Sequence, residues 1–111
     1  MNNHKVLTKR MDRAIFLAFK EEGHTDPIFG LLNAGVSPNY RRSTGETCLH
    51  AAAYRGSLEL ARDLISRGAS PHLKDAQGFL PVDLARMMGK QEVLHYLLSL
   101  PPPPQQSRPQ E

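Results

Sequence analysis

An internal period of 33 residues is the feature of this sequence that most restricts its fold. Shifting the middle of the chain downstream aligns similar residues without a gap: Gly45, Ala52, Gly56, Glu59 and Leu64 fall on Gly78, Ala85, Gly89, Glu92 and Leu97. Shifting it upstream gives a second series: Ala51, Gly56, Leu64, Gly68, Ser70 and Pro71 fall on Ala18, Gly23, Leu31, Gly35, Ser37 and Pro38. A constant period of this length is typical of stacked repeats, each too small to bury its apolar face alone.

The best-defined copy, residues 45–68, predicts two short helices placed back to back. Thr47 can cap a first helix, which carries a small apolar run and stops at Gly56. Ser57 can cap a second helix, which has apolar residues at helical spacing until Gly68. Helices this short are not stable alone, because each has only one apolar stripe to bury. The unit therefore needs copies of itself on both sides.

The middle copy resembles the ankyrin repeat. The matching residues are Gly45-x-Thr47-x-Leu49-His50-x-Ala52-Ala53, then Gly56, then Leu64-Ile65-x-x-Gly68-Ala69. The resemblance covers roughly residues 6–100 and is closest in the middle. It implies an all-α ankyrin-repeat solenoid of three stacked helix-turn-helix units with projecting hairpin-like loops. It also implies that His50, in the family's Thr-x-x-His motif, ties the turn of one repeat to the next.

The chain divides into three parts. Residues 1–11 are polar and basic, apart from a short apolar break, and are expected to form an N-terminal extension or capping segment. Residues 12–100 are predicted to be the ankyrin repeat domain, with repeats at about 6–38, 39–71 and 72–100. Four prolines then stop the last helix, so residues 101–111 are expected to be a disordered proline-rich tail. The spacing Pro101-x-x-Pro104 would also suit the aromatic-lined groove of another protein.

Composition limits the function classes. Hydrophobic residues make up 40% of the 111, which suits a folded domain, and no apolar run approaches the ~18 residues of a membrane-spanning helix, so no membrane is expected. The net charge of +3 is small and dispersed, which argues against a nucleic-acid partner. A single cysteine, Cys48, excludes an internal disulfide and is compatible with a reducing compartment. We therefore expect a cytoplasmic protein, with the nucleus as an alternative.

No active site is predicted. The five histidines are far apart, and the sequence has no Cys-x-x-Cys or His-x-x-x-His spacing, so neither a metal nor another cofactor is expected. Cys48 lies close to His50 in the sequence, but neighbouring side chains on a helix point about 100° apart. A small buried thiol is therefore favoured over a nucleophile. The aspartates show no paired spacing for acid–base chemistry, so we expect a protein that is not an enzyme.

A binding surface is predicted on the concave side of the stack, where partners of the resembling family usually dock. Equivalent positions of successive repeats form rows there, and the later repeats place aromatic and methionine side chains in them. Basic residues would border this cluster and favour an acidic segment. Two pairs of opposite charges in neighbouring repeats, Arg13 with Glu46 and Glu22 with Arg55, are expected to neutralise part of the charge in the first half of the concave groove. The predicted partner-binding residues are Tyr40, Arg41, Arg42, Glu46, Tyr54, Arg55, Lys74, Gln77, Phe79, Met87 and Met88.

The sequence thus predicts a monomeric, non-enzymatic protein–protein interaction module, an adaptor or an inhibitor. Its expected partner is a protein segment with hydrophobic anchors and acidic flanks. The alternative is a terminal fragment of a longer ankyrin array with a mainly structural or scaffold role, whose neighbours would cover Phe79 and Met87. Two other interpretations of the apolar cluster stay open: a methionine can point into the stack, or the proline tail can fold over it. Asn39 is expected to be a turn residue, with hydroxylation as the alternative.

Overall fold

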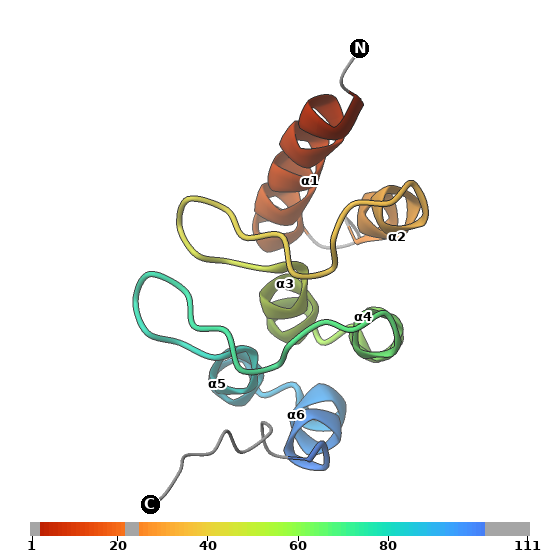
Figure 1. Cartoon of the computed structure of the whole chain (residues 1–111). Helices are drawn as coiled ribbons and strands as arrows, with labels where there is room; N and C mark the ends of the chain where they lie inside the picture. The colour runs from red at the N-terminus through yellow and green to blue at the C-terminus, as the bar shows by residue number, and fades with distance from the viewer. Residues whose placement is uncertain (1–2, 22–24, 102–111) are drawn as a thin grey trace, which may run out of the picture.

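A computed structural model describes residues 3–21 and 25–101 of the chain. These residues form six α-helices and no strand: α1 (Asn3–Lys20), α2 (Asp26–Asn33), α3 (Cys48–Arg55), α4 (Leu58–Ser66), α5 (Pro81–Met87) and α6 (Gln91–Leu98). Figure 1 shows α1, α3 and α5 in one row and α2, α4 and α6 in a second row. The first loop (residues 35–44) and the second loop (residues 68–77) project together on one side. The fold is the all-α stack of helix pairs that the sequence predicted.

Capping residues set the ends of the middle helices. The Thr47 hydroxyl oxygen accepts a hydrogen bond from the His50 amide at 3.3 Å at the start of α3. The Ser57 hydroxyl oxygen accepts one from the Leu60 amide at 3.2 Å at the start of α4. Gly56 ends α3 with φ of 76°, in the left-handed region that glycine enters without strain. The boundaries predicted for these two helices are confirmed.

The outer repeats begin their helices differently. In α5 the position of the capping threonine is taken by Leu80, which offers no side-chain cap. The Asp83 carboxylate instead accepts a hydrogen bond from the Leu80 amide at 2.9 Å, so aspartate does part of the work that histidine does in the middle repeat. In α2 the side chain of Thr25 makes no cap, and Pro27 lies in the first turn, where its missing N–H costs nothing.

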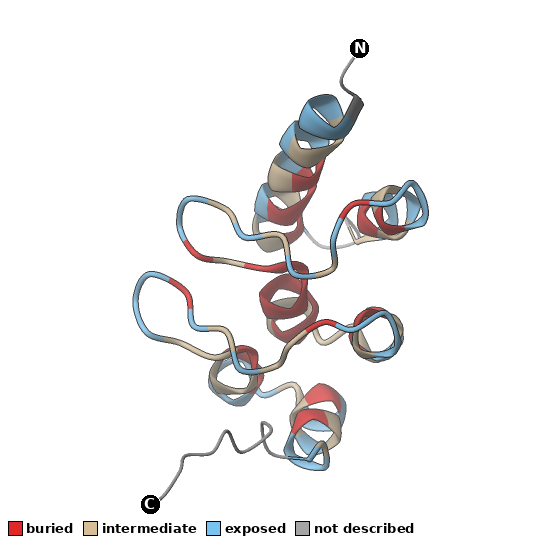
Figure 2. Ribbon diagram, in the orientation of Figure 1, coloured by how far each residue is buried: buried red, intermediate tan, exposed pale blue. Residues whose placement is uncertain are grey.

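The core is centred on α3. Every residue from Cys48 to Ala53 is buried, and Figure 2 shows this helix enclosed by its neighbours. The largest fully buried apolar side chains of the core each stabilise the fold by roughly 1.5–3 kcal/mol relative to exposure. They are Leu49 of α3 itself and, from the other helices, Met11, Ile15, Ile28, Leu60, Leu64 and Val93. Among the described residues, no helix has both the length and the apolar character that crossing a bilayer requires.

Helix α1 extends further toward the N-terminus than the repeat pattern indicated. The helix runs without a break across residues 11 and 12, where a domain boundary was expected. Met11 is fully buried, and its sulfur lies 3.4 Å from the sulfur of Cys48 in α3. The segment before residue 12 is therefore continuous with the first helix of the stack. The expected disordered tail, apart from Pro101, lies outside the described residues.

Candidate protein-binding surface

Side chains of the first loop bind the backbone of the second loop. The Asn39 amide group makes two of these hydrogen bonds: its nitrogen donates to the Gly68 carbonyl at 3.1 Å, and its oxygen accepts from the Ser70 amide at 2.7 Å. The Arg41 guanidinium donates to the carbonyl of Lys74. Asn39 thus has a structural role in the turn, as expected. These bonds hold the two loops side by side.

The imidazole of His50 links the middle repeat to the last. Its Nε2 donates to the Phe79 carbonyl at 2.8 Å, while its Nδ1 lies 3.2 Å from the Thr47 amide, from which it accepts. Burial lowers the pKa of His50, which favours the neutral ring that can donate and accept at once. The role that the family resemblance implied for His50 is therefore confirmed.

The carboxylate of Asp75 orders the tip of the second loop. One of its oxygens accepts hydrogen bonds from the amides of Gln77 and Phe79, both at 2.9 Å. Its own amide donates to the Phe79 carbonyl at 2.9 Å, and the next amide, of Ala76, donates to the Thr44 carbonyl of the first loop at 2.8 Å. The loop that carries Gln77 is therefore held by hydrogen bonds within itself and to its neighbour.

Arg42 is engaged within the protein. Its guanidinium donates to Asp12 of α1 at 3.0 Å and to Glu46 at 2.9 Å, and its central carbon lies 5.3 Å from the ring centroid of Phe16. Burial alone would lower the pKa of Arg42, but the hydrogen bonds to the two carboxylates raise it. The predicted pair of Arg13 with Glu46 is wrong, because Glu46 pairs with Arg42 instead. Arg42 and Glu46 are therefore less available to a partner than expected.

Three of the predicted contact residues are aromatic and half-buried. Tyr40, Tyr54 and Phe79 all pack against the core. The ring centroids of Tyr54 and Phe19 are 4.9 Å apart. Burial, with a smaller contribution from the Asp12 carboxylate, raises the pKa of the Tyr40 hydroxyl. The aromatic side chains that were expected to form an exposed cluster are thus largely packed within the stack.

Arg55 also binds its own chain. Its guanidinium donates to the carbonyl oxygens of Ala18 and, at 2.8 Å, Phe19, both at the end of α1. It satisfies two carbonyl groups that the end of a helix leaves without partners within that helix. Its predicted row partner, Glu22, lies outside the described residues.

The remaining predicted residues are exposed. Met87 and Met88, at the carboxyl end of α5, are 60% and 41% exposed, so neither points into the stack. Arg41, Lys74 and Gln77 are exposed on the loops that approach the opposite end of the same row of helices. Because α5 has seven residues, its two ends are about 10 Å apart. The exposed surface therefore has basic residues at the loop tips and two methionines at the far end of α5.

The thiol of Cys48 is buried and is not activated as a nucleophile. Burial raises the pKa of the Cys48 thiol to about 12, so it is protonated at neutral pH. Within residues 3–21 and 25–101, no group of three or more histidine, cysteine, aspartate or glutamate side chains is placed to hold a metal ion.

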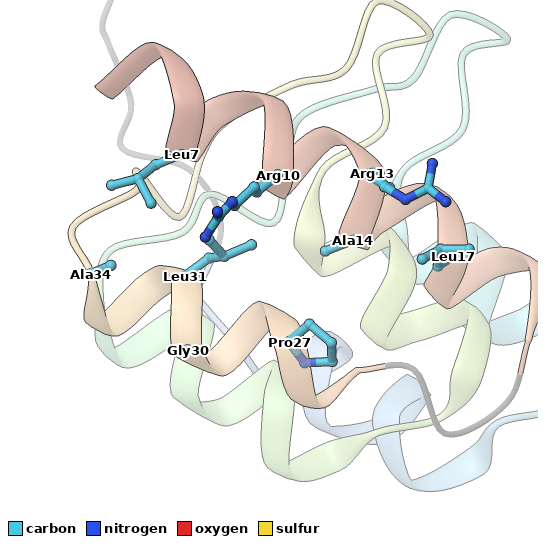
Figure 3. A pocket seen from close by; sticks show the side chains of 9 residues that line it. All are labelled: Leu7, Arg10, Arg13, Ala14, Leu17, Pro27, Gly30, Leu31 and Ala34. Atoms are coloured by element: carbon cyan, nitrogen blue, oxygen red, sulfur yellow. The ribbon is translucent and has the colours of Figure 1, made fainter. Parts of the chain in front are cut away.

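A groove between α1 and α2 was missed by the sequence analysis. It has a volume of about 470 Å³ and lies on the side of the first repeat that faces away from α3. Leu7, Ala14 and Leu17 line it from α1 (Figure 3). Together with Arg10 they recur at intervals of three and four residues, a spacing that places them on one face of a helix. That spacing was the available signal.

Comparison with known proteins identifies the repeat type. The family described as "Ankyrin repeats (many copies)" matches residues 31–85. Similar curated proteins include the potassium channel GORK of Arabidopsis thaliana, 36% identical over 68% of this chain and 9% of the channel. An ankyrin repeat-containing protein of Schizosaccharomyces pombe is 32% identical over 70% of this chain and 36% of its own length. The Notch-regulated ankyrin repeat-containing protein A of Danio rerio is 26% identical over 89% of this chain and 92% of its own length. The chain spans about a third or less of the first two relatives.

Proposed function

Because this chain belongs to the ankyrin-repeat family, we propose that it is a non-enzymatic protein-binding module, acting as an adaptor or as an inhibitor of its partner. Ankyrin repeats generally mediate protein–protein interactions. In the proposed complex, a partner segment docks on the concave row formed by α1, α3 and α5 and on the tips of the two loops. The observation that carries the proposal is the exposure of Met87 and Met88 at the end of α5.

Two features suit this surface to recognition. Methionine is flexible and polarisable, so an exposed pair can adapt to apolar side chains of different shape. The loops, in contrast, are tied together through Asn39, Arg41 and the Thr44 carbonyl, so little conformational freedom remains to be lost on binding. The rigid polar loops would give specificity, and the flexible methionines would accept apolar side chains of different shape.

The partner segment follows from this layout. Its apolar anchors would contact Met87 and Met88, and its carboxylates would pair with the exposed side chains of Arg41 and Lys74. The two groups must be separated by at least about 10 Å, which an extended chain covers in roughly three residues. The expected ligand is thus a short extended segment with an apolar end and an acidic end.

The test is a pull-down from native lysate with three matched baits. They are the wild-type chain, the double variant Met87→Asp/Met88→Asp, and Leu98→Asp, a control at an apolar residue of α6 that is 56% exposed. Phe79 is left unchanged because it packs against the core. We expect a partner that is retained by the wild type and by Leu98→Asp but lost with the double variant. Equal capture by all three baits would contradict binding through the methionines.

Localisation belongs to the same proposal. Cys48 is a free, buried thiol, which suits a reducing compartment, so we propose that the protein acts in the cytoplasm or the nucleus. Fractionation of the native source should place it there, and recovery from an oxidising compartment would contradict this.

A further inference from the structure

The outer side of the first repeat presents an apolar groove that no described part of the chain covers. Its floor is formed by Leu7, Ala14 and Leu17 of α1 and by Leu31 of α2 (Figure 3). Gly30 contributes no side chain, and a Cβ added there would meet nothing within 4 Å. The α2 side of the groove is therefore open enough to receive side chains from outside.

The repeat register indicates which kind of structural element fits the groove between α1 and α2. The positions 33 residues after Pro27 and Leu31 are Leu60 and Leu64, which are both fully buried inside the stack. Pro27, in contrast, is exposed and Leu31 is half-buried. Inside the stack, the corresponding side of a helix pair is covered by the helices of the preceding repeat. For example, α1 packs against α3. The groove is thus a surface of the kind that α-helices cover.

The groove carries an excess of positive charge. Arg10 and Arg13 border it and are exposed, and neither has a hydrogen-bond or ion-pair partner among the described residues. Arg10 reaches from α1 toward Leu31 (Figure 3). The whole of α1 contains five lysine and arginine residues and one acidic residue, Asp12, which already pairs with Arg42. An occupant with carboxylates at its edges would complement this field.

From these observations we propose that the groove between α1 and α2 is a second binding site, which receives an amphipathic α-helix of another protein. Apolar side chains spaced at i, i+3 or i+4, and i+7 would enter the groove. Carboxylates flanking that stripe would pair with Arg10 and Arg13. This site lies at the end of the stack, whereas the site proposed above lies along its concave row, so the two can be tested separately.

Other occupants fit the same features less well. A lipid surface would also attract the basic helix α1, but a flat bilayer cannot follow a hollow between two helices. A second copy that presented its own α1 would bring a helix with five basic residues and one acidic residue against this basic groove. A second copy that presented Leu98, at the opposite end of the stack, would form a head-to-tail contact. Such head-to-tail contacts do not close and lead to open chains of molecules. A separate acidic helix satisfies both the shape and the charge.

The experiment uses the full 111-residue chain and two synthetic helical peptides. Both peptides have about 18 residues and the same leucine stripe, flanked by glutamate in one and by lysine in the other. Fluorescence anisotropy measures their affinity for the wild type and three variants. Arg10→Glu/Arg13→Glu reverses the charge of the rim, and Gly30→Phe fills the groove from a position with free space. Lys9→Glu is the matched control, an exposed basic residue of α1 that does not line the groove.

We expect the glutamate peptide to bind the wild type at least about tenfold more tightly than the lysine peptide. Its affinity should fall about tenfold in the double charge reversal, disappear in Gly30→Phe, and change less than about threefold in Lys9→Glu, because salt screens charges away from the contact. Equal binding of the two peptides, or binding that survives Gly30→Phe, would overturn the proposal.

Two further measurements identify a different occupant. If sedimentation of the chain alone shows self-association that Gly30→Phe abolishes, the groove belongs to a second copy. If the chain binds phosphatidylserine-containing vesicles through Arg10 and Arg13 but does not bind the glutamate peptide, α1 contacts lipid. Either result would also overturn the proposal.

Discussion

Replacing His50 by alanine should remove a buried hydrogen-bonded link between the last two repeats. The Thr47 amide, in a residue only 1% exposed, would lose its acceptor at Nδ1, which costs about 1–3 kcal/mol. The Phe79 carbonyl would lose its donor at Nε2 but keep the Asp75 amide at 2.9 Å, so its loss is about 0.5–1.5 kcal/mol. The expected fall in the free energy of unfolding is about 2–4 kcal/mol, a large share of the ~5–15 kcal/mol of a small domain.

The same residue gives the effect a pH dependence of known sign. Burial lowers the pKa of His50 in the folded state, whereas an unfolded histidine titrates near pH 6.5. The unfolded chain therefore binds more protons, so this contribution to stability is complete above about pH 6.5 and is lost as the pH falls below that value. The difference between wild type and His50→Ala should accordingly shrink on acidification.

Urea unfolding followed by far-ultraviolet circular dichroism measures both effects. The wild type and His50→Ala would be compared at about pH 7.5 and 5.5, on either side of the unfolded pKa. His72→Ala, at an exposed histidine of the second loop, is the control and should unfold like the wild type at both values. A loss below about 1 kcal/mol for His50→Ala at the higher pH, or a difference that grows at the lower pH, would refute the reasoning.

Three further predictions concern single positions. Gly45→Ala should lower the free energy of unfolding by at least about 1–3 kcal/mol, because its φ is 83° and the new Cβ would lie 2.7 Å from the Ala76 nitrogen. Gly68→Ala, with φ of 98° but open space, should cost less, and equal losses in thermal melts would contradict the steric argument. Cys48, whose pKa is about 12, should react with iodoacetamide at mildly alkaline pH only in urea, so prompt labelling of the native protein would disprove its burial. Arg42→Met should destabilise the chain by about 1 kcal/mol in urea, and no change would show that its two ion pairs are ineffective.

The fold was predictable where local rules act over a few residues. Thr47, Gly56 and Ser57 set helix ends through capping and backbone preferences that are visible in the sequence itself. His50 followed from a motif that joins adjacent repeats, and the structure places its ring on the Phe79 carbonyl. The exposure of Met87 and Met88 followed from the repeat register, which places equivalent positions on one side of the stack.

Side-chain choices across the rows were not predictable in the same way. The register aligns backbone positions, but a long side chain such as that of Arg42 can reach several carboxylates, and it selects Asp12 and Glu46. Tyr54 is half-buried because it packs on Phe19, a contact that depends on where α1 ends. The groove between α1 and α2 was not predicted, because the repeat pattern describes contacts between repeats. This groove lies on the outer side of the first repeat, where no described repeat precedes it.

The central claim is that the concave row and the loop tips dock a partner segment. Hydrogen exchange of the backbone amides, measured by mass spectrometry with and without the captured partner, tests it most directly. Binding should slow exchange in residues 38–44, 71–77 and 85–89. Protection confined to α2, α4 and α6, with those three segments unchanged, would contradict it.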